Sequence, residues 1–280
     1  MRPYQLLMVL LGVFLATTLR AQEPVADDKS QLGTMSGRFI YDGDRPKPEA
    51  SPLEAIQVDT PLVRDNDGRV SGVELSYLDY LRAGIRPRTV DDSLLVGKEG
   101  GLANVFVFAT SPDAQSPIAD SQLAKPHALE IMNGQFSPRV LAVTAGDRLE
   151  IKNSDALGFG FHLMAIRNQE VNYLVPPNAT RSLVLSKPEK VPIRFRSDPQ
   201  SWATGLLLIH SNPHFAVSAP DGTFSIPNLP LGKWEFRAWH EKVGYLKNWP
   251  KGRFQFEIKQ GKNELGNVKL AAEMFRSSPK

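Results

Sequence analysis

The residues best suited to soft-metal chemistry are five histidines, because the sequence contains no cysteine. They are His127, His162, His210, His214 and His240. Imidazole nitrogens bind zinc and copper, so three of them could in principle hold either ion. None belongs to an H-x-H pair, and His210 and His214 flank Asn212-Pro213, where no helix can continue. We therefore expect no histidine metal site.

Other catalytic signatures are missing as well. Without cysteine the chain has no disulfide, thiolate metal site or cysteine nucleophile. It has no G-x-S-x-G elbow, no P-loop and no G-x-G-x-x-G before a helix, and His240-Glu241 lacks the second histidine of H-E-x-x-H. Adjacent acids such as Asp91-Asp92 are typical of solvated loops. We predict a protein that is not an enzyme and needs no cofactor.

The charge distribution argues against a nucleic-acid partner. The formal net charge is +3, and the lysines and arginines are scattered singly along the chain. A nucleic-acid binder needs a basic face that neutralises phosphates.

Residues 1–21 have the order of a secretory signal peptide: Arg2, an apolar run from Leu6 to Leu15, then small and polar residues up to Ala21. We expect cleavage after Ala21, the alternative being an uncleaved N-terminal anchor. No other stretch is long and apolar enough to span a bilayer. This predicts a periplasmic or secreted protein without an integral membrane segment, beginning with a flexible lead-in at 22–33.

The chain from Gly101 onward predicts an all-β fold. Short apolar runs alternate with turn residues, which is typical of a sandwich or barrel. The expected strands lie at 103–110, 127–132, 139–144, 148–153, 161–166, 182–185, 192–196 and 205–210, after a first strand at 37–41. Between the first strand and these runs lies a long insert, 42–96, with one helical candidate, Leu75 to Ala83, stopped by Gly84.

A second, smaller unit is expected from Ser211 to Ala271, followed by a tail at 272–280. Trp234, Phe236, Ala238 and His240 alternate with polar residues, which predicts a half-buried strand. Trp239 falls on the opposite face. The junction 211–217 is short and not Gly/Ser-rich, so it is not a flexible linker. A large indole such as that of Trp239 is more stable in a contact with another unit than in water. We therefore expect the two units to pack together.

Several blocks, in order along the chain, resemble a known family. They are SGRFIYDG at 36–43, LVGKEGGLANVFVF at 95–108, FSPRVLAV at 136–143, GDRLEIKNSD at 146–155, PHFAV at 213–217 and DGTF at 221–224 through AWHEK at 238–242. The family is that of the cupredoxin-domain proteins, common in planctomycetes, often labelled methylamine utilisation proteins. The last blocks also resemble carboxypeptidase regulatory-like domains. The resemblance implies a cupredoxin-like Greek-key β-sandwich over 34–210, then a small transthyretin-like β-sandwich over 211–271.

The resemblance also implies where copper ligands would lie. The four positions, normally His, Cys, His and Met, fall on Phe159, Ser197, Gln200 and Ala203, beside a retained Trp202. Blue copper needs a thiolate and two imidazoles around the metal. All four positions are substituted, so we expect that the copper site has been lost.

The aromatic residues near these positions leave two interpretations open. Phe159, Phe161 and Trp202 would refill the vacated pocket as hydrophobic core, which we favour because replacement by Phe and Ala is what core repair requires. Alternatively Phe161, Trp202 and Trp239 form an exposed patch for a partner or glycan.

These observations together predict an exported, non-enzymatic scaffold or binding protein whose partner is an envelope protein or a polysaccharide. A metal-free accessory protein of a periplasmic electron-transfer system is the alternative, and a carbohydrate-binding surface module is a second one.

Overall fold

A computed structural model describes residues 32–47, 51, 53, 72–110 and 124–276. The expected signal peptide, nearly all of the lead-in, much of the insert and the last four residues of the tail lie outside these ranges. Within them, no helix is both long enough and apolar enough to cross a membrane.

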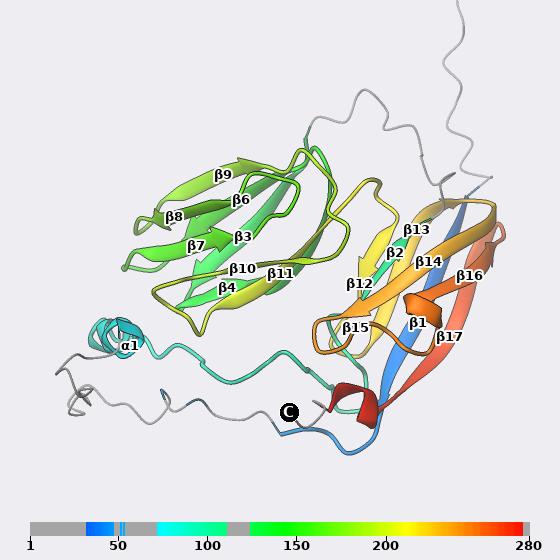
Figure 1. The fold of residues 1–280 in the computed structure, drawn as a ribbon, viewed down its shortest axis with the longest axis horizontal. Helices are drawn as coiled ribbons and strands as arrows, with labels where there is room; N and C mark the ends of the chain where they lie inside the picture. Colours follow the sequence, from blue (N-terminus) through cyan, green and yellow to red (C-terminus); the bar gives the residue numbers. More distant parts are fainter. Residues whose placement is uncertain (1–31, 48–50, 52, 54–71, 111–123, 277–280) are drawn as a thin grey trace, which may run out of the picture.

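The all-β prediction is confirmed: the described chain forms two β-sandwiches side by side, with one α-helix at the end of the first (Figure 1). The first, which we call the central sandwich, runs from Pro126 to His210 and packs a four-stranded sheet, in the order β4-β3-β6-β9, against a five-stranded sheet, in the order β5-β11-β10-β7-β8. Its strands are β3 (Pro126–Met132), β4 (Gln135–Ser137), β5 (Val140–Thr144), β6 (Arg148–Asn153), β7 (Phe159–Leu163), β8 (Val171–Val175), β9 (Thr180–Val184), β10 (Ile193–Arg196) and β11 (Thr204–His210).

Alternation of apolar and polar residues decides which face of each strand is buried in the central sandwich. Ile193 and Phe195 of β10 point into the core, whereas Arg194 and Arg196 point outward. The same holds along β6, where Leu149 and Ile151 are fully buried. Burial of such side chains stabilises the fold by about 1.5–3 kcal/mol each.

The second unit, the terminal sandwich, packs a three-stranded sheet, β13-β1-β17, against a sheet in the order β12-β2-β14-β15 with β16 also paired to β14. Its strands are β1 (Leu32–Asp42), β2 (Phe106–Ala109), β12 (Phe215–Val217), β13 (Thr223–Pro230), β14 (Gly232–His240), β15 (Gly244–Tyr245), β16 (Arg253–Ile258) and β17 (Gly261–Ala271), with a short 3-10 turn, η4 (Pro250–Gly252), before β16.

The expected boundary at Ser211 is wrong for two strands. β1 and β2, which the sequence assigned to the first unit, pair with β13, β17, β12 and β14 of the terminal sandwich. Neighbours in sequence usually become neighbours in a sheet, but a pattern of alternation does not specify a distant partner. The central sandwich is therefore inserted between β2 and β12 of the terminal one.

Two predicted ends also need correction. Leu32 and Gly33, expected in the flexible lead-in, already belong to β1. The expected tail begins with a 3-10 helix, η5 (Ala272–Phe275). Phe275 is buried there, with its ring 5.6 Å from Tyr41 and 5.4 Å from His240 between centroids.

The helix expected in the insert is present as α1 (Gly72–Arg82). It ends where Gly84 adopts a positive φ of 77°, which a residue with a side chain adopts only with strain. Tyr77, Leu78 and Tyr80 of α1 are buried against the central sandwich. From α1 a connecting segment, residues 85–95, runs back to the terminal sandwich (Figure 1).

The two sandwiches share a hydrophobic contact, as expected from Trp239. Leu206 and Leu208, on the outer face of β11, are buried with Phe106 and Phe108 of β2. Trp239 packs against this cluster with its ring 5.8 Å from that of Phe106. Trp239 is thus a contact between the units and not part of an exposed aromatic patch.

Candidate functional site

The position implied for the first copper ligand lies in the core. Phe159, on β7, is fully buried, and its ring meets Phe136 edge-to-face at 5.1 Å. Tyr80 of α1 covers the other side of the ring at 6.3 Å. Phe161, two residues along the same strand, is also fully buried and packs on Phe195 and Tyr173. Neither phenylalanine is exposed to a partner.

The second and third positions form a buried hydrogen-bonded pair. The Ser197 hydroxyl donates to Oε1 of Gln200 at 2.5 Å, and the same oxygen accepts the backbone N–H of Gly160 at 3.1 Å. The Gln200 amide nitrogen donates to the hydroxyl of Ser76 in α1 at 2.9 Å. Buried polar groups must be satisfied in this way or they destabilise the fold. The polar groups of Ser197 and Gln200 therefore hydrogen-bond within their own loop and connect this loop to β7 and to α1.

The fourth position, Ala203, and the retained Trp202 lie in the same loop, between β10 and β11. Ala203 is buried, and its carbonyl accepts the N–H of Ser197 at 3.0 Å. Half-buried Trp202 donates its indole N–H to the Gly134 carbonyl at 2.9 Å and packs edge-to-face on Tyr77 and Tyr80. The sequence did not reveal that α1 supplies the cover, because 120 or so positions separate the helix from this loop.

The Asn-Ser-Asp segment after β6 also serves the fold. Asn153, fully buried, donates to the carbonyls of Leu157 and Val175 at 2.8 and 3.0 Å. Asp155 accepts the N–H groups of Asn133 and Gly134 at 2.7 and 2.8 Å. Burial, together with this carboxylate, raises the pKa of the Tyr80 hydroxyl, which stays protonated.

In the described part of the chain, no three His, Asp or Glu side chains are arranged to hold a metal ion. His162 contacts Glu170 and Asp198 at 2.6 and 3.1 Å, and His127 contacts Asp147 at 2.8 Å. The others are buried: His214 stacks edge-to-face on Trp234, and His210 lies against Phe108 and Phe215. His240 lies in the terminal core, as its alternation predicted.

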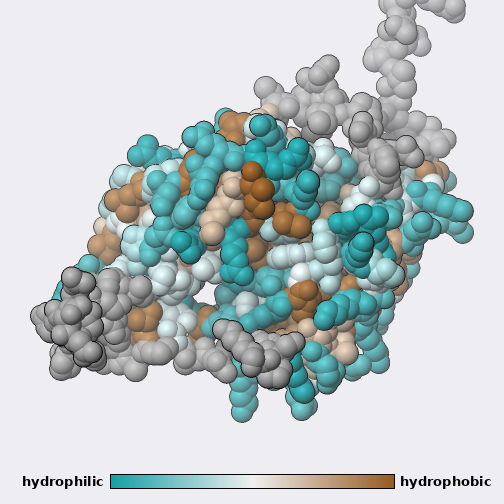
Figure 2. All heavy atoms as spheres, in the orientation of Figure 1, coloured by the Kyte–Doolittle hydropathy of each residue, from teal (hydrophilic) through white to brown (hydrophobic). Residues whose placement is uncertain are grey.

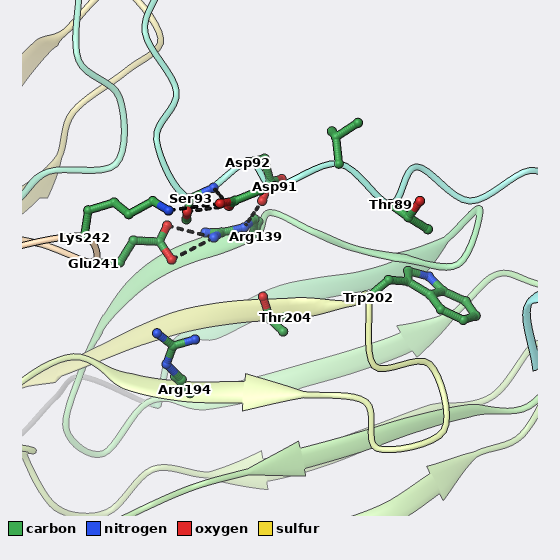
Figure 3. A pocket seen from close by; sticks show the side chains of 11 residues that line it. Thr89, Asp91, Asp92, Ser93, Arg139, Arg194, Trp202, Thr204, Glu241 and Lys242 are labelled. Carbon is green, nitrogen blue, oxygen red and sulfur yellow. Dashed lines mark hydrogen bonds and ion pairs between the residues drawn. The ribbon is translucent and has the colours of Figure 1, made fainter. Parts of the chain in front are cut away.

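An open cavity lies where the central sandwich, the connecting segment and the terminal sandwich meet (Figure 3). Its volume is about 340 Å³, and its lining is mainly polar. The connecting segment contributes residues 89–93, the central sandwich contributes Arg139, Arg194, Trp202 and Thr204, and the turn after β14 contributes Glu241 and Lys242.

Ion pairs cross this cavity. Arg139 is only 15% exposed, and its Nε lies 2.6 Å from Oδ1 of Asp92. Its Nη2 donates to both carboxylate oxygens of Glu241, at 2.7 and 2.8 Å. Lys242 binds Asp91 at 2.9 Å. The paired acids that looked like solvated loop charges therefore join both sandwiches through the connecting segment (Figure 3).

Local environment alters the pKa of several of these groups. Burial raises the pKa of Glu241, although Arg139 acts against this shift. Burial would also raise the pKa of Asp91, but hydrogen bonds from Ser93 and Lys242 outweigh it and hold that pKa at about 2. Next to Glu241, burial and then the charge of Arg139 lower the pKa of His240 to about 4. His240 is therefore neutral at pH 7.

A second open cavity, about 470 Å³, adjoins the first on the outer face of the five-stranded sheet. Met164, Arg194, Arg196, Ser197, Asp198, Ser201 and Thr204 line it. Arg196 is paired with Asp198 at 2.8 Å. The sequence did not single out Arg194 or Arg196, because an outward-facing arginine on a strand is ordinary. Both arginines lie on β10, beside the part of this sheet face, β5 and β11, that the terminal sandwich covers.

No protein-family model and no curated protein matches this sequence. Solved structures that match part of the fold include an amicyanin, a cupredoxin and a nitrite reductase. An amicyanin variant in its Cu(I) form is 18% identical, with a TM-score of 0.28, and covers 37% of this chain and 98% of its own. The purple cupredoxin of Nitrosopumilus maritimus is 14% identical (TM-score 0.25; 29% of this chain, 97% of its own).

The third match is the Cu-containing nitrite reductase of Thermus scotoductus SA-01, at 14% identity and a TM-score of 0.28. The match covers 36% of this chain and 27% of that enzyme, so this chain corresponds to about a quarter of its length.

Proposed function

We propose that this is an exported, non-enzymatic binding protein, built on a cupredoxin-like sandwich that has given up copper. The observation that carries the proposal is the state of the four implied ligand positions. Phe159 and Ala203 are buried in apolar contacts, while Ser197 and Gln200 bond to each other and to α1. None of these four side chains is the imidazole, thiolate or thioether that a blue copper site uses, and the chain contains no cysteine, which supports the proposal.

What supports a binding role is the space between the two sandwiches. The ion pairs of Arg139 and the apolar contact of Leu206 and Leu208 with β2 hold the walls of this space together. Preorganised walls reduce the entropy lost on binding. A partner from the cell envelope, protein or polysaccharide, would be bound there.

A copper titration tests the first half of the proposal. Purified protein mixed with Cu(II) should show no visible Cu(II)–thiolate absorption and no change in melting temperature. The fourfold variant Phe159→His, Ser197→Cys, Gln200→His and Ala203→Met should acquire that absorption, because Ser197, Gln200 and Ala203 lie in one hydrogen-bonded loop that also contacts Gly160, the neighbour of Phe159. A copper band in the unmodified protein would refute the proposal; no band in a folded fourfold variant would refute the assignment of positions.

Site-specific crosslinking in cells tests the second half. A photo-crosslinking amino acid in place of Arg196, which is 48% exposed beside the cavity, should capture a partner. The same amino acid in place of Val184, 58% exposed on β9, is the matched control. Equal capture at both positions, or none at Arg196, would contradict a partner site between the sandwiches.

A further inference from the structure

The two cavities form one groove, because Arg194 and Thr204 line both of them. We call it the junction groove. Figure 2 shows this side of the molecule hollowed between the two units. In Figure 3, Arg194 and Thr204 rise from neighbouring strands toward the ion pairs of the connecting segment. A groove of this size lies within the range of pockets that hold small ligands.

Arg194 is the cation in the groove that makes no direct contact with a carboxylate of the described residues, although its charge acts over a longer distance on Glu241, against the rise in pKa that burial causes there. Arg139, Lys242 and Arg196 each lie within 4 Å of a carboxylate. Among the residues that the structure describes, none forms a hydrogen bond or ion pair with the Arg194 guanidinium. Such a guanidinium presents a planar set of donors that fits a carboxylate with two parallel hydrogen bonds.

The strand register decides on which face of the sheet Arg194 projects. Arg194 pairs across the sheet with Leu206, and paired residues of adjacent strands project on the same face. Leu206 is buried under the terminal sandwich, so Arg194 lies directly at the edge of that contact. The terminal sandwich thus forms one wall beside the arginine.

The remaining lining suits a sugar better than an acidic peptide. Ser201 and Thr204 offer hydroxyl groups, and the carboxylates of Asp91 and Asp198, already paired with Lys242 and Arg196, can accept further hydrogen bonds from sugar hydroxyls. The same carboxylates would repel an acidic peptide, which carries a negative charge at successive residues. One cation without a direct partner in the described chain matches a single carboxylate, so the groove suits a saccharide with one uronate unit among neutral sugars.

From these contacts we infer that the junction groove binds an acidic saccharide, a uronate, whose carboxylate lies on Arg194 and whose hydroxyl groups bind the polar lining. This inference rests on the proposed binding function and gives the chemical class of the partner.

Calorimetric titration with short oligomers that carry a single galacturonate, glucuronate or mannuronate unit among neutral sugars tests it. At least one should bind, and its methyl ester should bind about tenfold or more weakly, because a charge-assisted hydrogen bond contributes roughly 1.5–3 kcal/mol. Arg194→Gln should weaken the acid by a similar factor while leaving the ester unchanged, and Arg194→Lys should fall between. Arg181→Gln, an exposed arginine on β9, is the matched control.

The variants should keep the melting temperature, because the Arg194 side chain is exposed and not bonded to the fold. Absence of binding to all three oligomers, or equal binding of acid and ester, would overturn the inference. Polyglutamate that bound with the same dependence on Arg194 would replace the saccharide by an acidic peptide. Capture of a partner at Arg196 despite any of these results would leave the proposed binding function standing.

Discussion

At the scale of single residues, the side chains at the four implied ligand positions divide into two kinds. Phe159 and Ala203 fill volume, whereas Ser197 and Gln200 satisfy the polar groups that a loop around a metal would leave open. Both tasks are needed, because an empty cavity and an unbonded N–H each destabilise a core.

Phe159→Ala should lower the free energy of unfolding by about 3–5 kcal/mol, since its ring is fully buried between Phe136 and Tyr80. Urea denaturation monitored by circular dichroism measures the change. Leu174→Ala, at a residue 57% exposed on the neighbouring β8, should change it by no more than about 0.5 kcal/mol. Similar small effects for both variants would mean that Phe159 is not a core residue.

His240 should make stability depend on pH. Its pKa is about 4 in the folded protein, below the ordinary value of 6.5, so the unfolded chain binds the proton more readily. The contribution of neutral His240 to the free energy of unfolding is therefore fully present above pH 6.5. It is lost as the pH falls toward 4, by up to about 3 kcal/mol. The lowered pKa values of His210 and His214, both caused first by burial, act in the same direction.

Denaturation at several pH values between 4 and 8 checks this prediction. Glu241, with a raised pKa, acts in the opposite direction, so the useful quantity is the difference between the wild-type protein and His240→Gln. The variant should show a shallower loss of stability on acidification. Parallel curves would show that the fold does not lower the pKa of His240.

At the scale of elements, the connecting segment joins three parts of the molecule. It leaves α1, passes the cavity, and carries Asp91 and Asp92 to Lys242 and Arg139. Sequence reasoning located the helix and most strands, because alternation and turn residues act within a few positions. It missed these ion pairs, because Arg139 and Glu241 are separated by 102 positions.

Arg139→Met should destabilise the protein by about 3–5 kcal/mol, because it leaves the carboxylate of Glu241, only 5% exposed, without its counter-charge. Arg148→Met removes a surface pair with Glu150 in which both side chains are more than 40% exposed, and should cost no more than about 1 kcal/mol. Chemical denaturation compares the two. Adding Glu241→Gln to Arg139→Met should restore part of the loss, and no restoration would argue against a direct coupling.

At the scale of the whole molecule, the sequence predicted two β-sandwiches that pack together but drew the border between them incorrectly. β2 has the composition of a buried strand in either unit, and only its pairing with Phe215 to Val217 and with β14 decides where it belongs. Such pairing depends on three-dimensional closure, which a linear pattern does not contain.

We expect both sandwiches to tumble as one body in NMR relaxation, with a single rotational correlation time. Leu208→Asp places a charge in the contact between them and should split one thermal transition into two, because each sandwich keeps its own core. Leu174→Asp, on an exposed position of the same sheet, should preserve the single transition. Separate correlation times in the wild-type protein would contradict a fixed arrangement.

Because the central sandwich is inserted between β2 and β12, the strands of the terminal sandwich become available for pairing at widely separated times during synthesis. A ribosome or an export channel releases β1 roughly 180 residues before β13, the first strand that pairs with it, and about 220 before β17. Until their partner strands emerge, β1 and, once it is made, β2 lack the sheet neighbours they have in the finished fold, whereas all strands of the central sandwich emerge in one continuous run. The central sandwich can therefore fold first, and its completion brings the chain at Ala109 back beside Phe215, ready for the terminal strands to close around it.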